Sequence, residues 1–180
     1  PEQLAIVQQG GITAVRCKGE SNGAFAFKVN GGTPNYTITI EGPAGSVALA
    51  SPVSDVYTQE GLAAGTYTVS VTDYKGCSAT KSFDIGEPGA VLSATVTSTK
   101  ETCTGNDGTA TVAAAGGYEG YTFAWSNGQN SANATNLSSS NGGVYTVTVT
   151  DAEGCTTTAA DTITLNNPLA MNSITGPAVC

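Results

Sequence analysis

The chain has 180 residues, a formal net charge of −8 and a charged fraction of only 11%. Because it contains no histidine, it cannot form a Ser-His-Asp or Cys-His triad, a histidine-ligated zinc site or a histidine pH switch. The acidic balance argues against nucleic acid as a partner, since phosphates need a basic face, and no apolar run is long enough to span a membrane.

No charged and then apolar leader opens the chain, so we expect a mature segment or a piece of a longer protein. Five cysteines in an acidic, polar chain indicate an oxidising, extracellular compartment. Their odd number leaves at least one of them without a partner inside the chain.

Alternating apolar and polar residues predict β-strands along the whole chain. The pattern occurs at 24–29 and 36–40, and it is strongest in Tyr67-Thr-Val-Ser-Val-Thr72. No stretch of ten residues has helical periodicity. In the second half the same pattern predicts strands near 91–99, 109–114, 121–126, 132–137, 144–150 and 155–165.

The two halves of the chain repeat each other. Gly65–Cys77 matches Gly143–Cys155, and both segments end in Thr-Asp-x-x-Gly-Cys. Each half also begins with a Cys-x-Gly motif, at Cys17 and Cys103. The period of roughly 80 residues exceeds that of a solenoid unit and equals a small domain. We expect domains at 1–87 and 88–167, followed by the first strand of a third at 168–180.

About seven short strands per repeat predict an all-β fold of tandem immunoglobulin-like (PKD- or fibronectin III-like) β-sandwich domains. Leu62, a glycine turn and then Tyr67 at the start of the penultimate strand have the sequence of a tyrosine corner. Leu137 and Tyr145 repeat this arrangement. Trp125 is expected to face the core on the third strand.

Together these motifs resemble the SprB repeat, which is named for a gliding adhesin of Bacteroidota. The resemblance rests on Cys-x-Gly, Asn/Asp-Gly, Gly-Gly…Tyr and Gly-x-Tyr-x-Val-x-Val-Thr-Asp-x-x-Gly-Cys, and it covers 1–180. It implies a structural and adhesive stalk segment of a long cell-surface filament at the outer membrane, exported by the type IX system. The implied partners are neighbouring repeats, the gliding and secretion machinery, and an external surface or polysaccharide.

The first repeat departs from the second by an insertion at about 41–52, which predicts a protruding loop or an added edge strand. Ile40, just before it, takes the position of Trp125. The alternative function is a carbohydrate- or protein-binding module, with this insertion as the place for binding. Tyr121 and Trp125 are instead expected in the core, and Tyr74 is expected at a hairpin tip, which argues against a binding role for them. The aromatic residues that could stack on a sugar are Tyr57, Tyr74, Tyr118, Tyr121 and Trp125.

The carboxylates are scattered and form no acid pair of the glycosidase type, so we expect neither an enzyme nor a cofactor. Asp73 and Asp151 begin the repeated Asp-x-x-Gly turns. Their carboxylates are expected to accept a hydrogen bond from the backbone N–H two residues later in the turn. A calcium site is the less favoured interpretation. Asp161-Thr162-Ile163 resembles the O-glycosylation signal of Bacteroidota, with Thr162 as acceptor or as an ordinary strand residue.

The cysteines allow several pairings. Pairing within each repeat, Cys17–Cys77 and Cys103–Cys155, would leave Cys180 over. In a sandwich these partners lie at opposite ends, roughly 25–30 Å apart, whereas a disulfide needs Cα atoms within about 7 Å. We therefore prefer an inter-repeat bond, Cys17–Cys155, with the other cysteines paired in neighbouring repeats or unpaired. Pairing across the linkers (Cys77–Cys103, Cys155–Cys180) and free thiols stay open.

Overall fold

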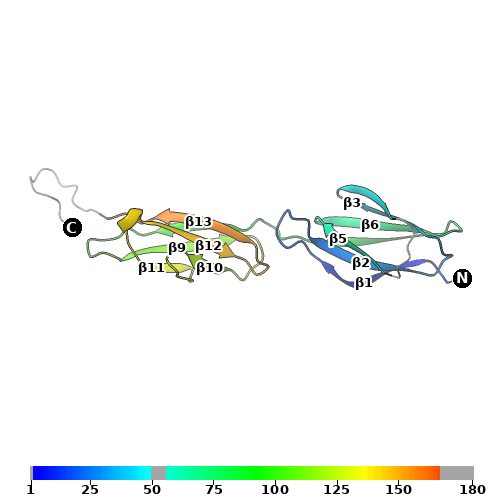
Figure 1. Cartoon of the computed structure of the whole chain (residues 1–180), viewed down its shortest axis with the longest axis horizontal. Coiled ribbons are helices and arrows are strands. Elements are labelled where there is room, and N and C mark those ends of the chain that lie inside the picture. Colours follow the sequence, from blue (N-terminus) through cyan, green and yellow to red (C-terminus); the bar gives the residue numbers. More distant parts are fainter. Residues whose placement is uncertain (1, 50–55, 167–180) are drawn as a thin grey trace, which may run out of the picture. The chain divides into compact units, whose positions relative to one another are not determined.

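The computed structural model describes residues 2–49 and 56–166. The chain divides into two compact units, Pro1–Pro88 and Gly89–Cys180, here called domain 1 and domain 2. Both are built of strands, and domain 2 also has one short 3-10 helix, η1 (Ser140–Gly142), as the ribbon in Figure 1 shows. The strand predicted at 168–180 lies outside the described residues.

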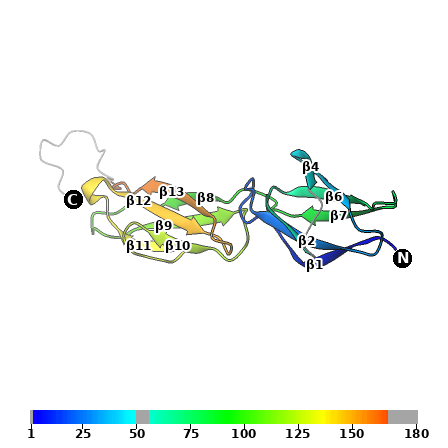
Figure 2. The same ribbon diagram turned by 45° about the vertical axis from the view of Figure 1, so that its right-hand side comes forward.

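Domain 1 is a sandwich of two antiparallel sheets. One sheet has the order β1-β2-β5 and the other the order β4-β3-β6-β7. Figure 2 shows β1 and β2 in one layer and β6 and β7 in the other. The strands are β1 (Ala5–Thr13), β2 (Gly23–Asn30), β3 (Thr37–Gly42), β4 (Gly45–Leu49), β5 (Tyr57–Leu62), β6 (Gly65–Thr72) and β7 (Ser78–Ile85).

Domain 2 repeats this topology without a counterpart of β4. Its sheets have the orders β11-β9-β8 and β10-β12-β13. The all-β sandwich prediction is confirmed, although the described part of domain 2 has six strands instead of about seven. These strands are β8 (Ser93–Ser98), β9 (Gly108–Ala115), β10 (Thr122–Trp125), β11 (Asn133–Leu137), β12 (Val144–Thr150) and β13 (Thr156–Thr162).

The additional strand of domain 1 comes from the insertion. β4 pairs antiparallel with β3, with Ile40 opposite Val47 and Gly42 opposite Gly45. Of the two predicted forms, an edge strand is therefore the one present at 45–49. Val47 remains exposed on it.

Each domain buries the apolar side of its alternating strands. In domain 1 the core is aromatic: Phe25 stacks on Phe83 with ring centroids 4.4 Å apart, and Phe27 stacks on Tyr57 at 4.9 Å. Domain 2 has smaller residues on the matching strand, with buried Ala110 and Val112 on β9. The two cores therefore fill the same fold with different side chains.

Trp125 compensates for those small residues. It pairs with Val147 on β12, as Ile40 pairs with Val69 on β6, so the two positions are equivalent. Trp125 is 4% exposed, and its indole N–H donates to Ser131 O at 2.8 Å. The large residue thus lies on β2 in domain 1 and on β10 in domain 2, which conserves core volume.

The Asn/Asp-Gly motif has a packing explanation. A Cβ atom on Gly23, at the start of β2, would lie 2.5 Å from Ile85 Cγ2 and 2.9 Å from Leu62 O. Gly108 has the matching contacts at the start of β9, where a Cβ would lie 2.8 Å from Ile163 Cγ2. Only glycine allows the last strand to pack this closely on the first sheet.

We expect Gly23→Ala to lower the free energy of unfolding of domain 1 by about 1–3 kcal/mol, because the new methyl group overpacks the core. Urea unfolding followed by circular dichroism measures the change. Gly11→Ala is the matched control, since no atom lies within 4 Å of a Cβ there. Equal losses in the two variants would contradict the packing explanation.

Candidate functional site

The repeated motifs gather at the two ends of each domain. Residue Thr72 pairs with Ser78 at one end of the β6–β7 pair, and Gly65 pairs with Ile85 at the other. We call the first the hairpin end, because it contains the β6–β7 turn at 73–77. We call the second the loop end, because the β1–β2 loop at 14–22 reaches it.

The chain enters each domain at the hairpin end and leaves it at the loop end. In domain 1, Gly32 N donates to Glu2 O at 2.9 Å beside the hairpin, and Val15 N donates to Gly86 O at 2.8 Å at the loop end. Domain 2 repeats both contacts: Gly117 N donates to Ala90 O, and Glu101 N to Thr164 O, each at 2.9 Å. Each domain therefore separates its entry and exit points by the length of its strands.

Asp73 organises the hairpin end of domain 1. Its Oδ1 accepts from Lys75 N at 2.9 Å and Cys77 N at 2.8 Å, and its Oδ2 accepts from Thr33 N at 2.9 Å. The Thr33 N–H is the main reason why the pKa of this carboxyl is lowered. Asp73 thereby ties the β6–β7 turn to the β2–β3 turn.

Asp151 does the same in domain 2. Its Oδ1 accepts from Glu153 N and Cys155 N, at 3.0 and 2.8 Å, and its Oδ2 accepts from Tyr118 N at 2.9 Å. Burial acts to raise the pKa of Asp151, but these N–H donors outweigh it and the net pKa is lowered. Both aspartates have the tight-turn arrangement, and their oxygens face backbone donors instead of a shared oxygen-lined cavity of the kind calcium needs.

The Gly-Gly…Tyr motif builds the other half of the hairpin end. Gly31 has φ = 68°, and a Cβ there would lie 2.3 Å from Gln3 O. Tyr36 Oη donates to Gly31 O at 2.7 Å, and Tyr121 Oη donates to Gly116 O at the same distance. These residues shape a turn, so the motif is structural.

The tyrosines predicted at corners bond back to the preceding turn. Tyr67 is buried and its Oη donates to Ala63 O at 3.1 Å. Tyr145 Oη donates to Ser138 O at 3.2 Å and accepts from Ser138 N at 3.0 Å. Leu62 is half-buried beside the first corner, and Leu137 is fully buried beside the second.

The loop end differs most between the domains. In domain 1 it contains the ion pair between Lys18 Nζ and Glu87 Oε1, at 2.7 Å, and a fully buried Val15. Domain 2 has Glu101 at the position of Val15, and this carboxylate is only 5% exposed. The sequence analysis missed Glu101; its one signal was an acidic residue where the first repeat has valine.

Glu101 is held by donors from two segments. Its Oε2 accepts from Ser139 N and Ser139 Oγ, both at 2.6 Å, and its Oε1 accepts from Asn106 N at 2.6 Å. These bonds, led by the Ser139 hydroxyl, lower the pKa of Glu101 from its ordinary value of 4.5 to about 2. A buried anion thus fastens the β8–β9 loop to the residues before β12.

The lowered pKa of Glu101 predicts acid sensitivity in domain 2. Its stabilisation is fully present above pH 4.5 and is lost as the pH falls toward 2. Trp125 is the one tryptophan of the sequence, so its fluorescence reports unfolding of domain 2 alone. We expect the urea midpoint from Trp125 to decrease between pH 4.5 and pH 2.

Glu101→Gln is the control for this prediction. Glutamine keeps the shape but does not titrate, so the variant should be less stable at pH 7 and show a flatter pH profile. A Trp125 midpoint with the same pH dependence in both proteins would contradict the role of Glu101.

The cysteines differ in state. Cys17, Cys103 and Cys155 are disulfide-bonded, whereas Cys77 is an exposed free thiol. The alternatives Cys17–Cys77 and Cys77–Cys103 are therefore wrong. Cys180 lies outside the described residues.

Strand geometry argues against pairing within a repeat. Cys77 directly precedes β7, whereas Cys17 lies beside Lys18, which bonds Glu87 just beyond the other end of that strand. The eight residues of β7 span about 25 Å, far more than a disulfide reaches. In domain 2, β9 separates Cys103 from the Cys155 turn in the same way.

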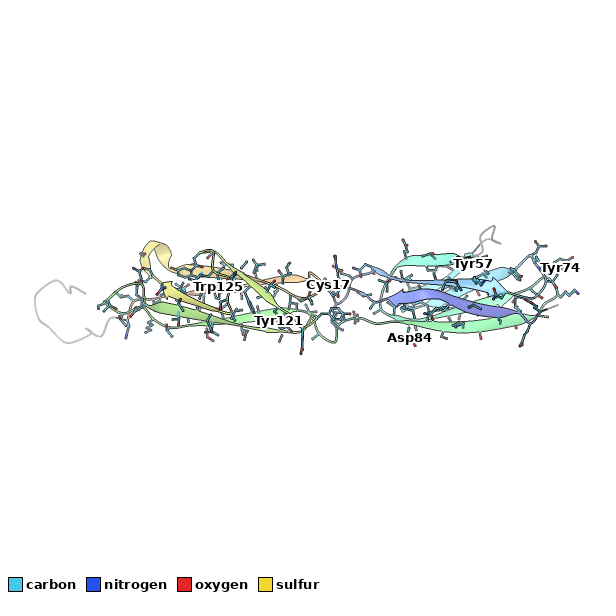
Figure 3. All side chains as sticks on the ribbon, turned by 90° about the horizontal axis from the view of Figure 1, so that it is seen from below. Cys17, Tyr57, Tyr74, Asp84, Tyr121 and Trp125 are labelled. Atoms are coloured by element: carbon cyan, nitrogen blue, oxygen red, sulfur yellow. The ribbon has the colours of Figure 1, made fainter. Side chains whose placement is uncertain are left out.

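The candidate sugar-stacking aromatic residues lie in different surroundings. Tyr57 stacks on Phe27 in domain 1, and Tyr74 is 74% exposed at the hairpin tip (Figure 3). In domain 2, Trp125 is buried and Tyr121 is bonded through its hydroxyl, as described above. Tyr118 is half-buried, with its backbone N–H bonded to Asp151.

Thr162 is exposed at the end of β13, where it lies opposite Val144. The neighbouring Asp161 carboxylate accepts from Ser98 Oγ at 2.7 Å. The threonine is therefore accessible, whereas its aspartate neighbour is engaged by β8.

Across residues 2–49 and 56–166, no three histidine, cysteine, aspartate or glutamate side chains gather as a metal site would require. Within the same described part, no helix has the length and apolar character needed to cross a bilayer.

Several solved structures resemble this chain at low sequence identity. The three N-terminal domains of the bacteriophage RB49 highly immunogenic outer capsid protein are 19% identical, with a TM-score of 0.49, and the match covers 90% of this chain and 59% of that one. The fibronectin(III)-like modules of Clostridium thermocellum CbhA are 10% identical (TM-score 0.38; coverage 89% and 95%). DIP-gamma IG1+IG2 is 13% identical (TM-score 0.41; coverage 90% and 98%).

The comparison with curated proteins returned no match. Residues 95–130 match the family model described as the SprB repeat. This segment runs from β8 through β10 and includes the Cys-x-Gly, Asp-Gly and Gly-Gly…Tyr motifs. Domain 2, an all-β sandwich, therefore carries a SprB-type repeat, which supports a surface-protein repeat module.

Proposed function

We propose that the chain is a stalk segment of a long cell-surface filament, a gliding-motility adhesin exported by the type IX system. The observation that carries the proposal is the placement of entry and exit at opposite ends of each domain. Repeats of this kind extend a chain by one domain length each, because every domain passes the polypeptide from its hairpin end to its loop end.

The repeated motifs support a structural role. They provide turns, corners and close packing, through Asp73, Tyr36, Tyr67 and Gly23 in domain 1 and their counterparts in domain 2. These residues shape the two ends of each domain. Their repetition therefore keeps the same chain entry and chain exit in each repeat. Immunoglobulin-like repeats are typical non-enzymatic modules, which agrees with this role.

The test is to locate the protein on cells of the source organism. An antibody against the chain should label intact cells, and a strain without the type IX translocon should lose that label and retain the protein inside. Deletion of the gene should abolish spreading on a surface. Labelling that does not depend on the translocon would refute export by this route, and normal spreading of the deletion strain would refute the role in gliding.

A binding function has one supporting observation. The insertion in domain 1 forms a groove of about 190 Å³ between β4 and β5, lined mainly by apolar residues such as Ile40, Val47, Leu62 and Tyr67. The described part of domain 2 has no strand equivalent to β4. A glycan array on the whole chain tests this candidate: saturable binding that Val47→Glu removes would support it, and an array without signal would exclude the glycans tested.

Thr162 is our proposed O-glycosylation acceptor, supported by its exposure at the end of β13. Mass spectrometry of the chain purified from the source organism should find a glycan on it. Thr158, also on β13 but not preceded by an aspartate, is the internal control.

A further inference from the structure

We propose that successive repeats are joined covalently, by a disulfide from the loop-end cysteine of one repeat to the hairpin cysteine of the next. In this chain the bond is Cys17–Cys155, and Cys77 is the acceptor for a repeat that precedes domain 1 in a longer array. The inference rests on the proposed function, which supplies the tandem array and the oxidising compartment.

The two hairpins have the same local structure but opposite cysteine states. Cys77 N donates to Asp73 Oδ1 at 2.8 Å, as Cys155 N donates to Asp151 Oδ1 at 2.8 Å. Even so, Cys77 is exposed and reduced, whereas Cys155 is 8% exposed and bonded. The local fold cannot cause this difference. What differs is position, since domain 2 directly follows a repeat that carries Cys17 at its loop end.

Cys17 lies where the chain leaves domain 1. The adjacent Lys18 donates from Nζ to Glu87 Oε1 and to Pro88 O, at 2.7 and 3.2 Å, and Gly19 N donates to Glu87 Oε2 at 3.0 Å. These contacts hold the Cys-x-Gly loop against the last residues of the domain.

Cys155 lies where the chain enters domain 2. Gly117 N donates to Ala90 O, and Asp151 is close enough that its Oδ2 would be 2.4 Å from a Cβ on Gly117. Only Gly89 separates Pro88 from Ala90 in the sequence. The chain residues that contact the Cys17 loop and the Cys155 hairpin are therefore separated by one residue in the sequence, whereas β8 leads the chain away toward Cys103.

The hairpin end of domain 1 has room for such a loop. Cys77 borders a recess of about 380 Å³ that is also lined by Leu4, Thr33, Asp73, Lys75 and Ser78. The occupant we assign to it is the Cys-x-Gly loop of a preceding repeat, because the proposed Cys17–Cys155 bond gives the same kind of loop to the matching hairpin of domain 2.

The bond forms by thiol–disulfide exchange with a disulfide donor, such as an envelope oxidoreductase or, in vitro, oxidised glutathione. One cysteine thiolate attacks the donor's S–S bond, a mixed disulfide forms and one donor thiolate leaves. The second cysteine thiolate then attacks the mixed disulfide and expels the other donor thiolate. The two cysteines lose two protons and two electrons, and the donor disulfide becomes two thiols.

The bond would limit stretching. A force applied to the ends of the chain would pass through the disulfide and bypass the roughly 140 residues between Cys17 and Cys155, about 450 Å of extended chain at ~3.3 Å per residue. An array joined in this way is nearly inextensible even when single domains unfold.

Peptide mapping of the whole chain, folded with oxidised glutathione, tests the pairing. Trypsin with an Asp/Glu-specific protease places all five cysteines on separate peptides. We expect a linked peptide with Cys17 and Cys155, and alkylation of Cys77 without reduction. A link from Cys17 to Cys103 or Cys180, or alkylation of Cys17, would overturn the proposal and leave the surface role untouched. The cuts used follow Arg16, Lys18, Lys75, Lys81, Glu101, Asp107, Glu153 and Asp161.

Two variants guard against misfolding as an explanation. Cys17→Ser should make Cys155 alkylatable in a chain whose Trp125 fluorescence is unchanged. Cys103→Ser should retain the linked peptide of Cys17 and Cys155. Loss of the link in the Cys103→Ser variant would contradict the assignment.

The acceptor role of Cys77 is tested by placing a copy of 1–88 directly before the whole chain, which preserves the spacing between domains. Oxidation should then protect the original Cys77 from alkylation, whereas Cys17→Ser in the added copy should restore its reactivity. A Cys77 that remains reactive next to a folded added repeat would overturn this part of the proposal.

Discussion

Phe25→Ala should unfold domain 1, or leave it barely folded, while domain 2 keeps its stability. Phe25 is 2% exposed and stacks on Phe83. Its ring centroid lies 4.4 Å from that of Phe83 and 5.9 Å from that of Tyr67. Removing such a ring costs about 3–5 kcal/mol. This is a large share of the roughly 4–13 kcal/mol that stabilise a domain of this size.

The two domains can be followed separately in this experiment. Urea unfolding monitored by circular dichroism reports both domains, and Trp125 fluorescence reports domain 2. We expect the dichroism curve to shift or lose its first transition while the fluorescence curve is unchanged. Leu137→Ala, a fully buried change in domain 2, is the matched control and should shift the fluorescence curve. A fluorescence shift in Phe25→Ala would mean that the domains do not fold independently.

Trp125→Ile should destabilise domain 2 by about 2–3 kcal/mol, less than a truncation to alanine would, although isoleucine is the residue at the same position of domain 1. The indole donates to Ser131 O, next to Ala132, whose carbonyl accepts the Val112 N–H at 2.9 Å. Isoleucine would leave a cavity there, because domain 2 lacks the phenylalanine that domain 1 has at the position of Val112.

Adding Val112→Phe to Trp125→Ile tests this explanation, since it copies the arrangement of Phe27 and Ile40 in domain 1. The double variant should recover part of the lost stability, measured by circular dichroism or calorimetry. If the double variant is no more stable than Trp125→Ile, a large residue on β9 does not compensate for the loss of the large residue on β10.

The strands could be predicted from the sequence because one face of each is buried, which fixes a period of two. Tyr67, Val69 and Val71 alternate with polar residues and are all buried on β6. The predicted strands of the second repeat agree closely with β8 to β13. The form of the insertion could not be predicted, because β4 depends on pairing with β3 and not on its own sequence alone.

The buried acid of domain 2 could not be predicted in the same way. A glutamate in a sequence is normally read as exposed, and Glu101 is buried only because Ser139, 38 residues away, and Asn106 supply its donors. Which cysteines share an end of a domain was also open from the sequence, because the strand registers decide it.

Under the proposed function, each repeat is an independently folded domain, and successive domains extend the chain in series. Single-molecule stretching of the whole chain by its two ends, in reducing buffer, tests it most directly. We predict two separate unfolding steps, each releasing about 300 Å of chain at ~3.4 Å per residue. One step that releases both domains together, or a gradual extension without steps, would contradict the account.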